Sequence, residues 1–179
     1  MSKAVHRFDE SCEKTQALDD EWWRKAYLVA FPTCIGFAEV KGDCQAQRNG
    51  VDRIVLLPGG RSILVDEKTR LGDWPDILLE VWSDEAKRKR GWICKEDMHC
   101  DYVAYAFAST SICYMLPYRS LRAAWSRFGR EWWSLAKSTD TNGFKVIRAE
   151  NPSYTTMSVA VPTDTLLMAI ADMTRIDVA

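Results

Sequence analysis

Residues 51–70 place the strongest constraint on the fold of this chain. Residues 51–57 are rich in strand-forming side chains, Pro58, Gly59 and Gly60 make a turn sequence, and residues 62–65 form a second apolar run. Two such runs joined by a short, glycine-containing turn are typical of a β-hairpin. The second run continues into the polar residues 66–70. The sequence therefore predicts a hairpin with charged residues at its open end.

Periodic segments on both sides of this hairpin predict the remaining elements. Apolar residues recur at helical spacing in the first of them, at Leu18, Trp22, Ala26 and Val29. Helices are expected at about 9–30, at about 117–137 and, capped by Thr163, at 164–173. Further strands are expected at 77–82, 102–107, 112–116, 144–149 and 155–161, and residues 33–50 look less regular. This order predicts an α/β fold with a mixed central β-sheet flanked by helices.

Length and charge narrow the class of protein further. The chain has 179 residues, a usual size for one domain, so a single domain over residues 1–179 is expected. The formal net charge is −1, so any binding to a polyanion must come from local basic clusters. No apolar run approaches the ~20 residues that span a bilayer, and the first residues lack the apolar core of a signal peptide. We therefore expect a cytoplasmic protein without membrane contact.

Asp52, Asp66 and Lys68 are the candidate catalytic residues. Side chains alternate along a strand, so Asp66 and Lys68 share one face while Glu67 points to the other. Folding the chain at Gly59 and Gly60 brings Asp52 to the same end of the hairpin. Two carboxylates held close repel each other, and a divalent cation such as Mg²⁺ or Mn²⁺ removes that cost. A lysine beside such a metal can orient the attacking water and offset charge in a phosphodiester transition state.

The register of the hairpin decides whether this site can exist. A two-residue turn at Gly59 and Gly60 would set Asp52 opposite Glu67, facing away from Asp66. An odd-length turn at residues 59–61, or a bulge, would put Asp52 opposite Lys68 and on the same face as Asp66. We therefore predict an odd-length turn or a bulge between Asp52 and Lys68. The alternative is a solvated hairpin end whose salt bridges contribute only ~0–1 kcal/mol each.

At these residues the sequence resembles the PD-(D/E)XK nuclease superfamily. The strand-initial Asp52 matches the first half of that motif, and Asp66-Glu67-Lys68 matches the second, although Val51 replaces the proline. The resemblance implies a restriction-endonuclease-like core and a Mg²⁺- or Mn²⁺-dependent nuclease acting on DNA. Asp52 and Asp66 would bind the metal, the carbonyl of Glu67 would add a ligand, and Lys68 would assist the water. The tract 90–105 is similar to small phage or mobile-element members of the group.

Residues around this motif carry weaker predictions. Three residues could support the site from around it. Glu80 on the next expected strand could reach the metal or its waters, and Gln47 before the Asp52 strand could touch the substrate. Glu13 is the third, because members of the superfamily often add a helix acid to the site. Each has an alternative interpretation as a solvated surface residue.

Basic residues mark a candidate DNA surface, since Lys and Arg near an aromatic residue such as Trp92 suit phosphate contact and base stacking. They are Lys87, Arg88, Lys89, Arg90, Lys95, Arg119 and Arg122. A solubilising charged surface is the alternative interpretation. A non-catalytic DNA-binding or partner-binding module on the same fold also stays open, as does a homodimer. The absence of a glycine-rich phosphate loop argues against a small-molecule enzyme.

Overall fold

The computed structural model describes residues 20–40, 43–138 and 142–174. The chain divides into two compact units, each assembled from separated segments. One, the hairpin unit, takes the described residues within 20–73 and 96–118. The other takes the described residues within 74–95 and 119–174 and is called the α4 unit after helix α4 (Tyr118–Lys137). The expectation of a single domain over residues 1–179 stays a prediction.

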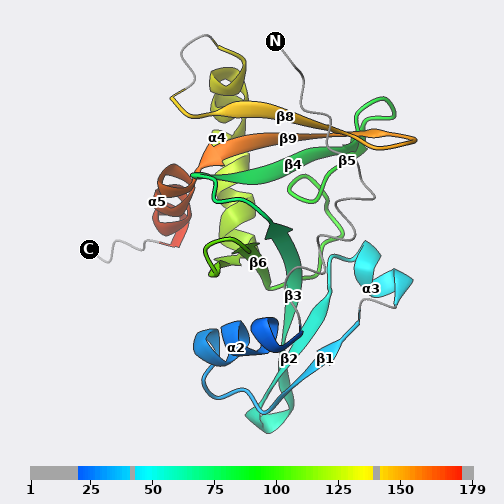
Figure 1. The fold of residues 1–179 in the computed structure, drawn as a ribbon, viewed down its shortest axis with the longest axis vertical. Coiled ribbons are helices and arrows are strands. Elements are labelled where there is room, and N and C mark those ends of the chain that lie inside the picture. Colours follow the sequence, from blue (N-terminus) through cyan, green and yellow to red (C-terminus); the bar gives the residue numbers. More distant parts are fainter. Residues whose placement is uncertain (1–19, 41–42, 139–141, 175–179) are drawn as a thin grey trace. The chain divides into compact units, whose positions relative to one another are not determined.

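A five-stranded mixed sheet forms the frame of the hairpin unit (Figure 1). Its strands, in spatial order, are β1 (Gly36–Glu39), β2 (Arg53–Leu57), β3 (Arg61–Arg70), β6 (Tyr102–Phe107) and β7 (Ile112–Pro117). Strands β1, β2 and β3 run antiparallel, β6 is parallel to β3, and β7 returns antiparallel to β6. The hairpin and the strands expected at 102–107 and 112–116 are confirmed, and so is the α/β class.

Two elements lie in the stretch that looked irregular. Strand β1 has four residues and no β-branched side chain, which explains why composition does not reveal it. The short helix α3 (Cys44–Arg48) begins after Asp43, whose carboxylate accepts hydrogen bonds from the backbone N–H groups of Gln45 and Ala46. An aspartate at this position is a standard helix N-cap, and that signal was available in the sequence.

Helix α2 (Asp20–Ala30) covers one face of this sheet. Its buried side chains are Trp23 and Tyr27, which stack with ring centroids 6.0 Å apart and pack against the strand residues Val55 and Val65. The expected apolar stripe is confirmed at Trp22, which packs against this core, and wrong at Val29, which is 82% exposed. The rings of Trp23 and Tyr27 are buried instead, because they bury more apolar area than Val29 would. The part of the expected helix at residues 9–19, with Leu18, lies outside the described residues.

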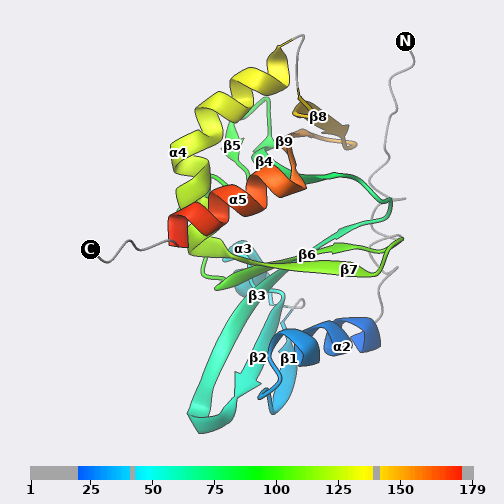
Figure 2. The same cartoon turned by 90° about the vertical axis from the view of Figure 1, so that its left-hand side faces the viewer.

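The α4 unit holds a second, wholly antiparallel sheet (Figure 2). Its spatial order is β5 (Lys89–Arg90), β4 (Asp76–Asp84), β9 (Thr155–Pro162) and β8 (Lys145–Glu150). Helix α4 (Tyr118–Lys137) and helix α5 (Thr163–Thr174) confirm the expected helices, Tyr118 itself falling in the hairpin unit. The predicted strands thus form two sheets instead of one, because β4 pairs with the distant β9 and not with β3.

None of the helices in the described ranges combines the length and the apolar character needed to cross a membrane.

Candidate active site

The turn of the hairpin sets the positions of the candidate catalytic residues. Leu57 pairs with Arg61, so the turn consists of the three residues Pro58–Gly60. Gly59 and Gly60 have φ values of +76° and +73°, which glycine adopts without strain. The predicted odd-length turn is confirmed.

The turn begins one residue earlier than expected, and this shifts the pairing. Arg53 pairs with Val65 instead of Glu67, and the regular ladder ends there, because the Asp52 N–H donates to the Val65 carbonyl, one position out of that register. The Asp52 carboxylate nevertheless lies beside Asp66, because it accepts from the Glu67 N–H and raises the pKa of Asp66. The hairpin unit therefore brings the three predicted residues together.

Asp66 is the buried member of the three. Its side chain is buried, and its Oδ1 atom accepts a hydrogen bond from Lys68 Nζ at 2.7 Å. Its Oδ2 atom is also buried and accepts no hydrogen bond from any described residue. Burial, with the neighbouring Asp52 carboxylate, raises the pKa of Asp66 to about 6 against the opposing effect of Lys68. A buried carboxylate oxygen without a partner is costly, and a bound cation would remove that cost.

Asp52 and Lys68 complete the charged cluster beside Asp66. The half-buried Asp52 accepts a hydrogen bond through Oδ2 from the backbone N–H of Glu67 at 2.8 Å, which orients its carboxylate. Lys68 is 32% exposed, so solvent and a substrate can reach it. In the described ranges no group of three or more His, Cys, Asp and Glu side chains is placed to hold a metal. Asp52 and Asp66 are the two carboxylates of the candidate metal site, and Mg²⁺ is usually bound through one or two carboxylates with several retained waters.

The side chain of Glu67 lies on the opposite face of the sheet, under α2. Its Oε1 atom accepts hydrogen bonds from the Tyr27 hydroxyl and from Arg53 Nε, both at 2.8 Å. Arg53 is only 2% exposed, and its Nη1 atom pairs with Asp20 Oδ1 at 2.8 Å. Burial and the Glu67 carboxylate raise the pKa of Tyr27, and Glu67 and Asp20 raise the pKa of Arg53 although burial opposes them. A metal role for Glu67 through its backbone carbonyl stays a prediction.

Sequence reasoning missed this buried charge network. Arg53 follows Asp52 and Glu67 follows Asp66, so alternation alone places both on the face opposite the candidate catalytic residues. An arginine and a glutamate on the buried face of a hairpin were the available signal, since buried charges occur in pairs. The network fixes the position of Asp52. The Glu67 N–H donates to the Asp52 carboxylate, and the Glu67 side chain is held on the other face of the sheet by Arg53.

The three residues expected around the candidate metal site lie in different parts of the chain. Gln47 is an exposed residue of α3 in the hairpin unit, and Glu80 belongs to β4 in the α4 unit. Glu80 lies beside Gly91, where an added Cβ would come within 2.3 Å of the Glu80 carbonyl oxygen. Glu13 lies outside the described residues. All three assignments stay predictions.

The expected DNA-contacting residues all belong to the α4 unit. Lys87, Arg88, Lys89 and Arg90 are exposed, and Lys87 pairs with Asp84 at 3.0 Å. Arg119 is also exposed. The half-buried Arg122 donates from Nη1 to the backbone carbonyl of Lys95, which gives it a structural role.

Trp92 does not fit the base-stacking role suggested for it. The side chain is only 8% exposed, so its ring belongs to the core of the α4 unit and is inaccessible to a base. The expectation that an aromatic ring accompanies the basic loop at Trp92 is therefore wrong. The apolar area of the indole explains its burial.

No family model, no curated protein and no solved structure matches this chain.

Proposed function

We propose that this chain is a metal-dependent nuclease that hydrolyses phosphodiester bonds in DNA at Asp52, Asp66 and Lys68. The observation that carries the proposal is the buried Asp66 Oδ2 atom, which has no hydrogen-bond partner among the described residues and lies beside the Asp52 carboxylate. A divalent cation between the two carboxylates would satisfy this oxygen and offset the repulsion between them.

The residues present fit a hard divalent cation. Asp66 Oδ2 and the Asp52 carboxylate would hold Mg²⁺ or Mn²⁺, and the Glu67 carbonyl is a further candidate ligand. When bound, the metal supplies Lewis acidity and a water of lowered pKa. The Glu67 N–H keeps Asp52 oriented, which limits reorganisation on binding. Lys68, held 2.7 Å from Asp66 Oδ1, places a positive charge where it can orient the attacking water and offset phosphate charge.

The order of elements in the hairpin unit supports membership of the PD-(D/E)XK superfamily and a restriction-endonuclease-like core. Helix α2 precedes an antiparallel hairpin, and the motif residues stand at the open end of that hairpin, followed by further strands. This is the order that the motif residues implied.

Incubation with DNA tests the proposal directly. Purified protein is incubated with linear, circular, branched and single-stranded DNA in Mg²⁺, Mn²⁺ or EDTA. Cleavage is expected only with metal, and Asp66→Asn and Lys68→Met should each lower its rate by at least about 100-fold. Asp73→Asn and Lys145→Met make the same chemical changes at exposed positions and should cleave normally. Metal-dependent DNA binding without cleavage of any substrate would instead favour a non-catalytic module.

The basic loop yields a separate prediction about DNA binding. Replacing Lys87, Arg88, Lys89 and Arg90 together by glutamine should weaken DNA binding and flatten its dependence on salt. Each lost phosphate contact reduces the slope of log K against log salt concentration by ~0.9. Fluorescence anisotropy at several salt concentrations measures this slope, with Arg61→Gln as an exposed control. An unchanged slope would return the loop to the role of a solvated surface.

A further inference from the structure

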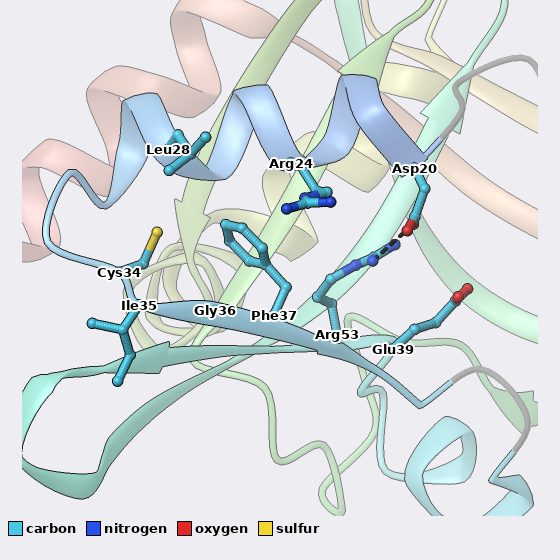
Figure 3. A pocket seen from close by; sticks show the side chains of 9 residues that line it. All are labelled: Asp20, Arg24, Leu28, Cys34, Ile35, Gly36, Phe37, Glu39 and Arg53. Carbon is cyan, nitrogen blue, oxygen red and sulfur yellow. Dashed lines mark ion pairs between the residues drawn. The ribbon is translucent and has the colours of Figure 1, made fainter.

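A cavity of about 470 Å³ opens between α2 and β1 in the hairpin unit (Figure 3). This volume is within the range of sites that bind small ligands or peptide side chains. Phe37 and Arg53 contribute to its lining, and both lie on the α2 side of the sheet. The cavity is therefore on the opposite face from Asp52, Asp66 and Lys68 and is not part of the candidate active site.

Strand β1 forms one edge of the five-stranded sheet, and β2 is its one neighbour in the part of the chain that the structure describes. The Val40 N–H donates to the Asp52 carbonyl. Hydrogen bonding alternates along an antiparallel strand, and Phe37 lies three positions before Val40. The backbone N–H and C=O groups of Phe37 therefore point away from β2. Such an edge is a template for an added strand, and side chains of that strand would alternate into the cavity.

The cavity is apolar at one end and cationic at its centre (Figure 3). Leu28 is 50% and Ile35 is 70% exposed at the apolar end. At the centre the Arg24 guanidinium lies 5.9 Å from the centroid of the Phe37 ring. Arg24 forms no ion pair with any residue in the described ranges, so its charge is available to an anion.

Carboxylates occupy the other end of the cavity. Asp20 pairs with the buried Arg53 through Oδ1 but remains 63% exposed, and Glu39 at the end of β1 is also exposed. Along the chain from Ile35 to Glu39, the cavity offers an apolar surface, then a cation, then carboxylates. A ligand complementary to this order carries an apolar group, an anion and a cation at successive positions.

We propose that this cavity binds an extended peptide segment that pairs antiparallel with the open edge of β1. Directly opposed residues in an antiparallel pair share a face, so alternate peptide side chains would enter the cavity. The segment would place a basic residue opposite Glu39 and an acidic residue opposite Phe37 within reach of Arg24. An aliphatic residue two positions further on would contact the Ile35 side chain without pairing with its backbone, because the Ile35 N–H donates to the Leu56 carbonyl. From its N-terminus onward, the peptide pattern is basic, any residue, acidic, any residue, aliphatic.

Fluorescence anisotropy with synthetic peptides tests this surface. The probe is a labelled seven-residue peptide with lysine, aspartate and leucine at positions two, four and six and threonine elsewhere. It should bind, and Arg24→Glu should weaken binding about tenfold, since an attraction becomes a repulsion. A peptide with lysine in place of aspartate should bind Arg24→Glu better than it binds the unchanged protein. The control Arg61→Glu, at an exposed position of the same unit, should bind the original peptide normally.

Further measurements separate this proposal from other occupants of the edge. Methylation of the aspartate backbone nitrogen should abolish binding, because that N–H would pair with Phe37. Equal binding of the methylated peptide, or of one with lysine and aspartate exchanged, would overturn the proposal. Sedimentation of the protein alone as a dimer that Ile35→Asp dissociates would also overturn it, since a second copy would then occupy the edge.

Discussion

Replacing Asp66 by asparagine is expected to stabilise the metal-free protein at pH 8 by up to about 3 kcal/mol. The pKa of Asp66 rises from 3.8 to about 6 on folding, chiefly through burial. A pKa that differs by one between the folded and the unfolded chain corresponds to about 1.36 kcal/mol, which sets the upper limit. Asparagine has the same shape and no charge to desolvate, although Lys68 loses an ionic partner. Urea denaturation in EDTA measures the difference.

The pH dependence of this effect has a definite sign. Below pH 3.8 the carboxyl is protonated in both the folded and the unfolded chain, so it carries no ionisation penalty. Between pH 3.8 and about 6 the unfolded chain releases this proton while the folded chain keeps it, and stability falls as the pH rises. The advantage of Asp66→Asn should therefore grow over this window and stay constant above it. Asp73→Asn, at an exposed site, should change stability by less than about 0.5 kcal/mol throughout.

Divalent metal should reverse the order of stability. A cation that binds only the folded protein stabilises it by about 4.1 kcal/mol at a thousand times its dissociation constant, which exceeds the advantage of about 3 kcal/mol expected for Asp66→Asn. Mg²⁺ or Mn²⁺ should thus raise the Tm of the unchanged protein in a thermal-shift titration and leave that of Asp66→Asn unaltered. An equal rise in both proteins would place the metal elsewhere. A destabilised Asp66→Asn in EDTA would show instead that Lys68 already compensates the buried carboxylate.

Removing the Glu67 side chain is expected to cost about 3–5 kcal/mol of stability, the usual effect of breaking a buried ion pair. Glu67→Ala leaves Arg53, which is 2% exposed, with Asp20 as its remaining carboxylate partner, and leaves the Tyr27 hydroxyl without its acceptor. Urea denaturation measures the loss. Glu21→Ala is the matched control, because it removes a glutamate whose ion pair is exposed. The Glu21 carboxylate lies 2.7 Å from Lys25 Nζ on the surface of α2. That change should cost no more than about 0.5 kcal/mol.

A double variant distinguishes the charge from the packing. Arg53→Met combined with Glu67→Leu removes both buried charges and keeps most of the volume, so it should recover much of the stability lost in Glu67→Ala. Failure to recover would mean that Tyr27 and Asp20 need the charged pair for their own placement. A loss in Glu67→Ala no larger than in Glu21→Ala would contradict the account of the network as a buried ion-pair system.

Local pattern alone was sufficient for much of the fold and for the grouping of the candidate catalytic residues. The hairpin, its odd-length glycine turn and the helix over Tyr118–Lys137 depend on neighbours in sequence, whose preferences act over a few residues. Alternation along β3 was enough to place Asp66 and Lys68 on one face and Glu67 on the other. The resemblance to PD-(D/E)XK nucleases used the same residues.

Tertiary packing decided the features that depend on distant partners. The pairing of β4 with β9, which makes a second sheet, joins strands far apart in the sequence and leaves no local pattern. The turn beginning at Pro58 set Arg53 against Val65, because backbone pairing and not composition selects among registers of equal parity. Competition for buried area placed Trp92 in a core and Trp23 and Tyr27 beneath α2. That packing brought Tyr27 to Glu67, and it left the Asp66 Oδ2 atom buried without a described hydrogen-bond partner beside Asp52.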